Sequence, residues 1–278
     1  MPEPLITIVT PAFQYYRFLK VCVASVEIQG YPNVEHLVLD GGSTDGTKEY
    51  LSTSPGCVTW WRSHPDGGQS QALNEGFARA SGEWIGWQNS DDFYYPGVFW
   101  MIPKILQIYP EAKVIVGDTA IADEYGTRTN LTGVTPVPVT QWYRGHWPYN
   151  QSMFFHQEIV ERVLPIDETL HFHMDIDFFA KIARLDVPIV YVNTLIGAFR
   201  KYVGIKTDNP QHLEQIRQEK ARLRERFQRE MWPRTGWQSQ CFRARHHIAV
   251  FRRFGLEAVV KRVFVRLERQ RQYNIVRY

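Results

Sequence analysis

The sequence contains few cysteines and no long apolar segment, and both absences narrow the classes of protein that it can encode. Its three cysteines, Cys22, Cys57 and Cys241, have neither the spacing of a disulfide framework nor that of a zinc site. The longest apolar runs have the length of a β-strand, well short of the roughly 20 residues that a membrane-spanning helix needs. No basic region followed by an apolar stretch and a cleavage site occurs at the N-terminus, so the cytoplasm is the expected compartment.

Charge is divided unevenly along the chain. The net charge is only +3, but residues 217–278 contain 17 Lys or Arg and 5 Asp or Glu, so the preceding residues carry an excess of negative charge. This division predicts an acidic body that can hold a metal cation and a basic C-terminal segment that is attracted to an anionic surface.

The first 120 residues alternate between apolar runs and amphipathic segments. Strands are expected at 5–9, 35–40, 58–62, 83–88 and 113–117, and helices near 17–28, 69–80 and 96–109, the last with a kink or break at Pro103. Ser43 or Thr44 is the expected cap of a further helix. This alternation predicts an α/β fold with a mostly parallel central sheet flanked by helices. The later half is expected to be mixed, with a hairpin around Gly126, helices at 175–184 and 209–230, and a strand at 188–193.

Carboxylates follow three of the four strands whose ends should form a ligand-binding edge, because open parallel sheets bind ligands at the carboxyl ends of their strands. The residues at these ends are Thr10-Pro11, Asp40, Asp91-Asp92 and Asp118. Two adjacent carboxylates such as Asp91 and Asp92 repel each other unless a cation or hydroxyl donors offset their charge, and Mg²⁺ and Mn²⁺ prefer oxygen ligands. The pair is therefore a candidate metal site; alternatively it only begins the turn before Pro96.

Four segments resemble glycosyltransferase family 2, whose members have the GT-A fold: TIVTPAF, LVLDGGSTDGT, PDGGQSQALNEGFARASGEWIGWQNSDD and MDIDFF. The resemblance covers about residues 4–207. It implies an inverting transfer of a sugar from a nucleotide-sugar donor, expected to be a UDP-sugar, to a saccharide acceptor in cell-surface polysaccharide biosynthesis. Mn²⁺ or Mg²⁺ is the implied cofactor, and a lipid-linked saccharide is one form that the acceptor could take.

The resemblance also implies roles for individual residues that bind the donor. The donor site would comprise Thr10, Pro11, Phe13, Asp40, Asp91, Arg200 and Lys206, and the metal would be held by Asp92 together with Asp91. A carboxylate can accept a hydrogen bond from a pyrimidine N–H, and the Phe13 ring offers a stacking face. A divalent cation would stabilise the negative charge that develops on the departing diphosphate. Asp45 is expected to be structural, because a turn and a helix start need acceptors at that point.

Asp175 matches the base of this family, which takes the proton from the attacking acceptor hydroxyl. Its predecessor Met174 replaces the usual Glu, and Tyr202 stands where a His is expected, so the sequence departs from the family at both positions. Asp177 is expected to be a cap or salt-bridge residue. The acceptor site is expected to include Asp118, Trp147 and Gln151, although core packing is an equal alternative for the tryptophan.

The resemblance suggests a GT-A domain over residues 1–207, with a nucleotide-binding half at 1–118 and an acceptor half at 119–207, followed by a basic helical extension at 208–278. An amphipathic pattern at 252–271 predicts a helix on an anionic membrane surface, at the inner face of the cell membrane, with packing on the catalytic domain as the alternative. No nucleic acid is expected as a partner, because no motif for reading it is present.

Two other functions stay open. One is a sugar-nucleotide pyrophosphorylase, which has a related fold but whose Gly-rich basic signature near the first strand is missing. The other is a non-catalytic nucleotide-binding assembly subunit, which the departures at Met174 and Tyr202 would allow.

Overall fold

The structure is a computed structural model that describes residues 3–53, 55–132, 142 and 147–227, and the statements below concern these residues. Its strands are β1 (Ile6–Ala12), β2 (Val34–Asp40), β3 (Val58–Ser63), β4 (Trp84–Trp87), β5 (Phe93–Tyr94), β6 (Val114–Ala122), β7 (Arg128–Thr132), β8 (Met153–His156) and β9 (Ile189–Arg200). Its α-helices are α1 (Tyr16–Glu27), α2 (Thr47–Ser52), α3 (Gln69–Arg79), α4 (Met101–Ile108), α5 (Gln157–Val163), α6 (Met174–Ala183) and α7 (Leu213–Arg226). Short 3₁₀ turns occur at η2 (Asn150–Ser152), η3 (Lys206–Asp208) and η4 (Pro210–His212).

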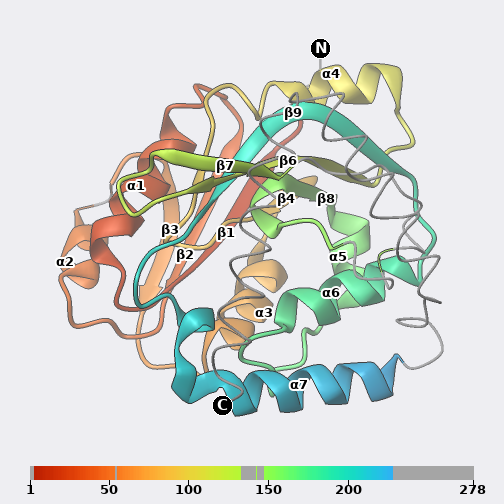
Figure 1. Cartoon of the computed structure of the whole chain (residues 1–278). Helices are drawn as coiled ribbons and strands as arrows, with labels where there is room; N and C mark the ends of the chain where they lie inside the picture. Colours follow the sequence, from red (N-terminus) through yellow and green to blue (C-terminus); the bar gives the residue numbers. More distant parts are fainter. Residues whose placement is uncertain (1–2, 54, 133–141, 143–146, 228–278) are drawn as a thin grey trace.

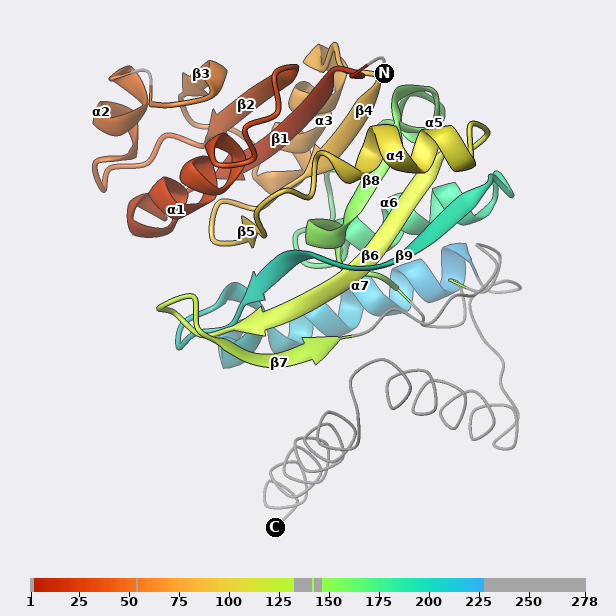
Figure 2. The same ribbon diagram turned by 90° about the horizontal axis from the view of Figure 1, so that it is seen from above.

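One sheet contains all the described strands, in the order β3-β2-β1-β4-β8-β6-β9-β5, with β7 paired to β6 (Figure 1). Strands β3, β2, β1 and β4 are parallel to one another, as are β6 and β9, whereas β8 is antiparallel to both of its neighbours. The predicted α/β fold with a mostly parallel sheet flanked by helices is therefore confirmed. The expected hairpin around Gly126 joins β6 to β7, and it lies beside the C-terminal part of β9 (Figure 2).

The sheet has apolar layers on both faces, because successive side chains of a buried strand point to opposite sides. Ile6 and Ile8 of β1 belong to the layer that includes Ile102 of α4. Val9 belongs to the opposite layer, which includes Leu73 of α3 and residues of α5 and α6. The helices thus cover both faces and leave the carboxyl ends of the parallel strands to the loops.

Two local expectations are wrong. Helix α2 begins at Thr47 and not at a cap on Ser43 or Thr44, because Asp45 accepts hydrogen bonds from the backbone N–H and the hydroxyl of Thr47 (3.2 and 2.7 Å). This also supports the structural role expected for Asp45. Helix α4 begins at Met101 and not at residue 96, so Pro103 lies in its first turn, where its missing N–H is not needed.

Helix α7 packs directly on the body of the protein. Leu223 and Phe227 join the apolar layer that contains α6, and the Arg226 guanidinium lies 3.2 Å from the carboxylate of Asp177. This part of the predicted C-terminal extension is therefore a packed helix, while the domain boundary at residue 207 and the division of the domain into halves stay predictions. The helix expected at 252–271 lies outside the described residues. Within the described part of the chain, no helix is long and apolar enough to cross a membrane.

Candidate functional site

Asp40, at the end of β2, is buried and bonded within the protein. Its carboxylate accepts hydrogen bonds from the backbone N–H of Ser43 (3.0 Å), from the Ser43 hydroxyl and from the Ser63 hydroxyl (2.6 Å). The Arg62 guanidinium donates to the backbone carbonyl of Asp40 (2.8 Å). The Asp40 carboxylate thus holds the turn after β2, and its contact with the nucleotide base stays a prediction.

The predicted donor-site residues at the end of β1 differ from one another in how far their side chains are exposed. Thr10 and Pro11 are buried, and the Thr10 hydroxyl lies 2.9 Å from Nε2 of His36, which is fully buried and whose pKa burial lowers to about 3. The side chain of Thr10 thus bonds within the core, and the contacts of Thr10 and Pro11 with the donor stay predictions. The Phe13 side chain is 57% exposed, and a Cβ on Gly41 would lie 3.2 Å from its ring. Phe13 beside the bare backbone of Gly41 is the part of this prediction that offers a surface to a base.

Asp92 is the buried member of the acidic pair that follows β4. Its Oδ1 accepts the backbone N–H of Arg200 (2.7 Å), and its Oδ2 accepts the side-chain amides of Asn89 (3.3 Å) and Gln151. Burial, followed by the neighbouring charge of Asp91, raises the pKa of Asp92 well above its usual range. These hydrogen bonds fasten the acidic turn to β9 and η2. A carboxylate has further lone pairs beyond those used here, so the role of Asp92 as a metal ligand stays a prediction.

Asp91, the other member of the acidic pair, is partly exposed, so its carboxylate is accessible to a divalent cation. The Tyr202 hydroxyl donates to its Oδ2 (3.0 Å), and burial raises the pKa of its carboxyl. In the described residues, no three His, Cys, Asp or Glu side chains cluster to hold a metal by protein ligands alone. Mg²⁺ and Mn²⁺ are often held by one or two carboxylates plus substrate phosphates, so Asp91 with a bound diphosphate is a sufficient ligand set.

Arg200 is enclosed by the protein. It is almost fully buried, and its guanidinium lies 4.7 Å from the ring centroid of Phe18. Its guanidinium donates to the backbone carbonyls of Asp91 (2.7 Å), Asp123 (3.3 Å) and Glu124 (2.9 Å). Arg200 thus joins the acidic turn to the β6–β7 hairpin, and its contact with the donor stays a prediction.

Asp175 lies in the first turn of α6. It is partly exposed and accepts the backbone N–H of Ile176 (2.8 Å), and burial raises its pKa to about 6. A carboxylate with a pKa this close to neutrality is suited to accept and release a proton. Met174, at the position where the family has Glu, is buried in the apolar layer. Asp177 is fully buried and pairs with Lys181 (2.6 Å), as expected for a salt-bridge residue.

The loop before α6 lies beside the first turn of α3. The ring of His171 is 3.7 Å from the position that a Cβ on Gly68 would occupy, and Gly68 immediately precedes α3. The Lys206 ammonium donates to the backbone carbonyl of His171 (2.7 Å), and burial lowers the pKa of Lys206. Because Lys206 is partly exposed, its contact with the donor phosphates stays a prediction.

The residues predicted for the acceptor site are mostly enclosed. Asp118 is buried in β6, where its backbone carbonyl accepts the hydroxyl of Ser152 (2.9 Å), and Gln151 is buried on Asp92. The contacts of Gln151 and Asp118 with the acceptor stay predictions, which their burial does not favour. Trp147 is partly exposed and stacks on Phe179 of α6, with ring centroids 6.4 Å apart, so its predicted contact with a sugar stays open.

Sequence analysis did not assign Asn89 to the site, although Asn89 connects three of its elements. Its amide oxygen accepts hydrogen bonds from Gln69 (2.9 Å) and from the Trp87 indole (2.8 Å), while its amide nitrogen donates to Asp92. Gln69 is the first residue of α3, so this network ties the helix start to the acidic turn. The sequence signal that could have indicated Asn89 is the polar pair Gln88-Asn89, which lies between an apolar strand and the acidic pair.

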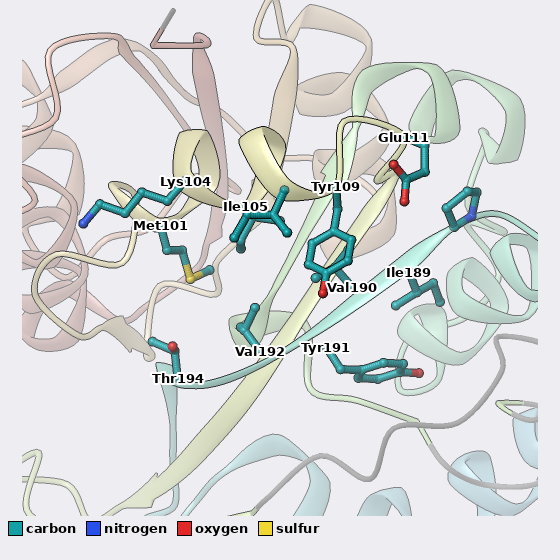
Figure 3. A pocket seen from close by; sticks show the side chains of 12 residues that line it. Met101, Lys104, Ile105, Tyr109, Glu111, Ile189, Val190, Tyr191, Val192 and Thr194 are labelled. Atoms are coloured by element: carbon teal, nitrogen blue, oxygen red, sulfur yellow. The ribbon is translucent and has the colours of Figure 1, made fainter. Parts of the chain in front are cut away.

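The pocket in Figure 3 lies elsewhere, between α4 and β9, and has a volume of about 550 Å³. Ile105, Tyr109, Val190 and Val192 are among the side chains that line it. None of the predicted site residues borders this pocket. The candidate site is therefore defined by the strand ends and the start of α6.

Comparison with known proteins decides the family. A family model described as Glycosyl transferase family 2 matches residues 7–160, which is more than half of the chain. The chain belongs to glycosyl transferase family 2. The matched residues extend from β1 into α5 and include the acidic pair, whereas Asp175 lies beyond them.

Similar proteins agree with this family and with the fold. An uncharacterised glycosyltransferase of Mycobacterium tuberculosis is 26% identical over 196 residues, which are 67% of this chain and 71% of that protein. Residues 1–349 of TarS from S. aureus, in complex with UDP-GlcNAc, superpose with a TM-score of 0.61 at 15% identity, over 72% of this chain and 59% of that one. The mannosyltransferase PcManGT from Pyrobaculum calidifontis, in complex with GDP-Man and Mn²⁺, gives a TM-score of 0.52 at 18% identity, over 78% and 61%. The fold of this family 2 protein is GT-A.

Proposed function

We propose that this family 2 protein is an inverting, metal-dependent glycosyltransferase in which Asp175 is the base. The observation that carries the proposal is a partly exposed carboxylate at a helix start, whose pKa is raised to about 6 by burial and which faces no saturating set of donors comparable to that of Asp92. General bases act best when their pKa lies near the working pH. Asp175 is therefore suited to proton transfer, whereas the carboxylates of Asp40 and Asp92 accept several hydrogen bonds from protein donors.

A UDP-sugar is the donor that we propose. The shared fold with TarS, which binds UDP and UDP-GlcNAc, supports it, and the exposed ring of Phe13 beside Gly41 supplies an aromatic face for a base. A GDP-sugar is the second candidate, because PcManGT shares the fold and binds GDP-Man.

In the proposed reaction, Asp175 takes the proton of the acceptor hydroxyl as that oxygen forms a bond to the anomeric carbon. The bond between this carbon and the diphosphate oxygen breaks on the opposite face of the sugar, which inverts the configuration. A bound Mn²⁺ or Mg²⁺ would neutralise charge on the leaving diphosphate, with Asp91 as its protein ligand. The buried carboxylate of Asp92 and the guanidinium of Arg200 keep the backbone of the acidic turn in place.

We further propose a saccharide acceptor, free or lipid-linked, in cell-surface polysaccharide biosynthesis. The excess of basic residues at 217–278 supports attraction to the anionic inner face of the cell membrane. Trp147, which is partly exposed beside α6, is the candidate stacking platform for an acceptor sugar.

A donor screen tests the proposal. Binding of UDP-GlcNAc, other UDP-sugars, GDP-mannose and dTDP-glucose is measured by calorimetry with and without Mn²⁺, and transfer is followed by product analysis with saccharide acceptors. We expect Mn²⁺-dependent binding of a UDP-sugar and a glycoside of inverted configuration. Absence of metal-dependent nucleotide binding would contradict the central claim. Formation of a nucleotide-sugar and pyrophosphate from an added nucleoside triphosphate and sugar 1-phosphate would establish a pyrophosphorylase, and binding without turnover would favour an assembly subunit.

A further inference from the structure

Glu219 is a fully buried carboxylate on α7 that binds a loop of another part of the chain. Its Oε1 accepts the backbone N–H of His171 (2.9 Å), and its Oε2 accepts those of Phe172 (2.9 Å) and His173 (3.2 Å). Hydrogen bonds to an ionised acceptor are stronger than those between neutral groups. Three successive N–H groups on one carboxylate therefore fix the course of the backbone over these residues.

These three residues lead directly into α6, whose second residue is Asp175. The first N–H groups of a helix lack partners within it, and His173, which precedes α6, makes no capping hydrogen bond with its side chain. Glu219 satisfies N–H groups at this end from another helix, and a negative charge there also suits the helix dipole. The position and direction of the first turn of α6 thus depend on a side chain of α7.

We propose that Glu219 is a positioning residue for Asp175 and that α7 is by this contact part of the catalytic machinery. The inference rests on the proposed function, because it takes Asp175 as the base. It places a residue needed for turnover in the segment after residue 207, where the sequence had indicated only an appendage.

Other contacts hold the same loop and the same helix. The Lys206 ammonium donates to the carbonyl of His171, so the loop is bound through its acceptor side as well as its donor side. At the far end of α7, Arg226 lies 3.2 Å from Asp177 of α6. A buried charge without partners is strongly destabilising. The three backbone N–H groups that donate to Glu219 therefore make a buried carboxylate tolerable at this position.

The test compares Glu219→Gln with Glu214→Gln, the same substitution at an exposed carboxylate on the same helix. The amide keeps the shape of Glu219 but turns one acceptor into a donor that faces N–H groups. We expect kcat to fall by about tenfold or more, because displacing a catalytic group by roughly 1 Å can cost about 100-fold. The KM and Kd for the donor should change much less than kcat, since Phe13 and Asp91 lie at the strand ends and not on this loop.

A pH profile adds a readout that general destabilisation would not change. The titratable groups around the start of α6 are Asp175, His171, His173, Glu219, Lys206 and Lys220. The pKa of Asp175 is raised to about 6 by burial, so a loosened loop that admits water should move the acid limb of kcat/KM to lower pH in Glu219→Gln. The limb should stay in place in Glu214→Gln.

The outcomes separate the two hypotheses. A Glu219→Gln variant with kcat within twofold of the parent, with an unmoved acid limb, or with an equal loss of donor affinity overturns the positioning role. If Glu219→Gln lacks a cooperative thermal transition, Glu219→Asp is measured in its place, because it keeps the charge but draws the carboxylate back from the three N–H groups. The same criteria then apply to it. Near-normal turnover in Asp175→Asn would instead refute the proposed base, whatever the result at Glu219.

Discussion

The acidic side chains at the strand ends and the one at the start of α6 are held in opposite ways. Asp40 and Asp92 are buried, and their oxygens accept several hydrogen bonds from protein donors. Asp175 is partly exposed, and burial outweighs its hydrogen bonds in setting its pKa. A carboxylate that accepts several hydrogen bonds from the protein holds a loop, whereas one that is partly exposed and accepts few of them can exchange a proton with a bound substrate.

The origin of the support also differs between the two regions. At the end of β2, the donors to Asp40 come from Ser43 and from Ser63 of the neighbouring strand β3. At the start of α6, the support comes from Glu219, on a helix that follows the whole sheet in the sequence. The turn after β2 is thus built by neighbouring segments, whereas the acidic turn after β4 and the start of α6 are both held by contacts distant in the sequence.

Replacement of the proposed base should have the largest effect. Asp175→Asn keeps the shape of the side chain but removes its ability to take a proton, so turnover should fall by roughly 100- to 10,000-fold. Donor affinity, measured by calorimetry with Mn²⁺, should not change. The matched control is Asp186→Asn, at an exposed position just after α6, which should retain the parent activity. Comparable turnover in the two variants would remove Asp175 as the base.

The two members of the acidic pair should respond differently to the same substitution. Asp91→Asn removes the proposed ligand, and we expect Mn²⁺-dependent donor binding to weaken by at least about tenfold, since even supporting residues of metal sites are worth about 10–100-fold. Asp92→Asn places an amide nitrogen against the donors of Asn89 and Gln151, so the free energy of unfolding should fall by about 1–3 kcal/mol. Calorimetry and thermal denaturation measure the two effects. If Asp92→Asn abolished the Mn²⁺ dependence of donor binding and Asp91→Asn did not, Asp92 would be identified as the main metal ligand.

The pH dependence of the parent protein should report the raised pKa of Asp175. A base acts in its deprotonated form, so kcat/KM should fall as the pH drops through about 6, whereas an ordinary aspartate would place this limb near pH 4. Burial lowers the pKa of the neighbouring His173, and the group that takes the proton in the proposed reaction is the Asp175 carboxylate. The limb should therefore persist in His173→Gln. An acid limb near pH 4 in the parent would contradict the environment assigned to Asp175.

The same comparison explains how far the sequence could be interpreted. Strands β1 to β4 and the helices between them were predictable, because buried parallel strands are apolar runs separated by turn residues. The direction of a side chain at a strand end was not, because it depends on partners elsewhere in the chain: Thr10 turns to His36, and Gln151 to Asp92. Strand β8 was missed because it has only four residues and lies buried between β4 and β6. Its residues therefore show no alternation of apolar and polar side chains.

Glu219 shows why the second region was harder to interpret. It lies in a helix rich in charged residues, LEQIRQEKARLRER, where a glutamate ordinarily indicates a solvated face. Only the packing of α7 on the loop before α6 distinguishes Glu219 from exposed Glu214 and Glu225. Asp175, by contrast, was found by its place in MDIDFF, although its raised pKa required the fold.

Truncation of the basic segment should have the smallest effect on turnover. This truncation separates the role of the basic segment from the role of α7. Removal of residues 228–278 takes away most of the excess positive charge after residue 216 but leaves Glu219 in place. Binding to vesicles that contain anionic lipid should weaken, since each basic residue near such a surface contributes on the order of 1 kcal/mol, while transfer to a soluble acceptor should persist. A longer truncation after residue 216, which also removes Glu219, should lose transfer as well, as measured with the same acceptor. Unchanged vesicle binding after the shorter truncation would argue against a membrane role for the segment, and equal turnover in both truncated proteins would show that the proposed base does not need α7.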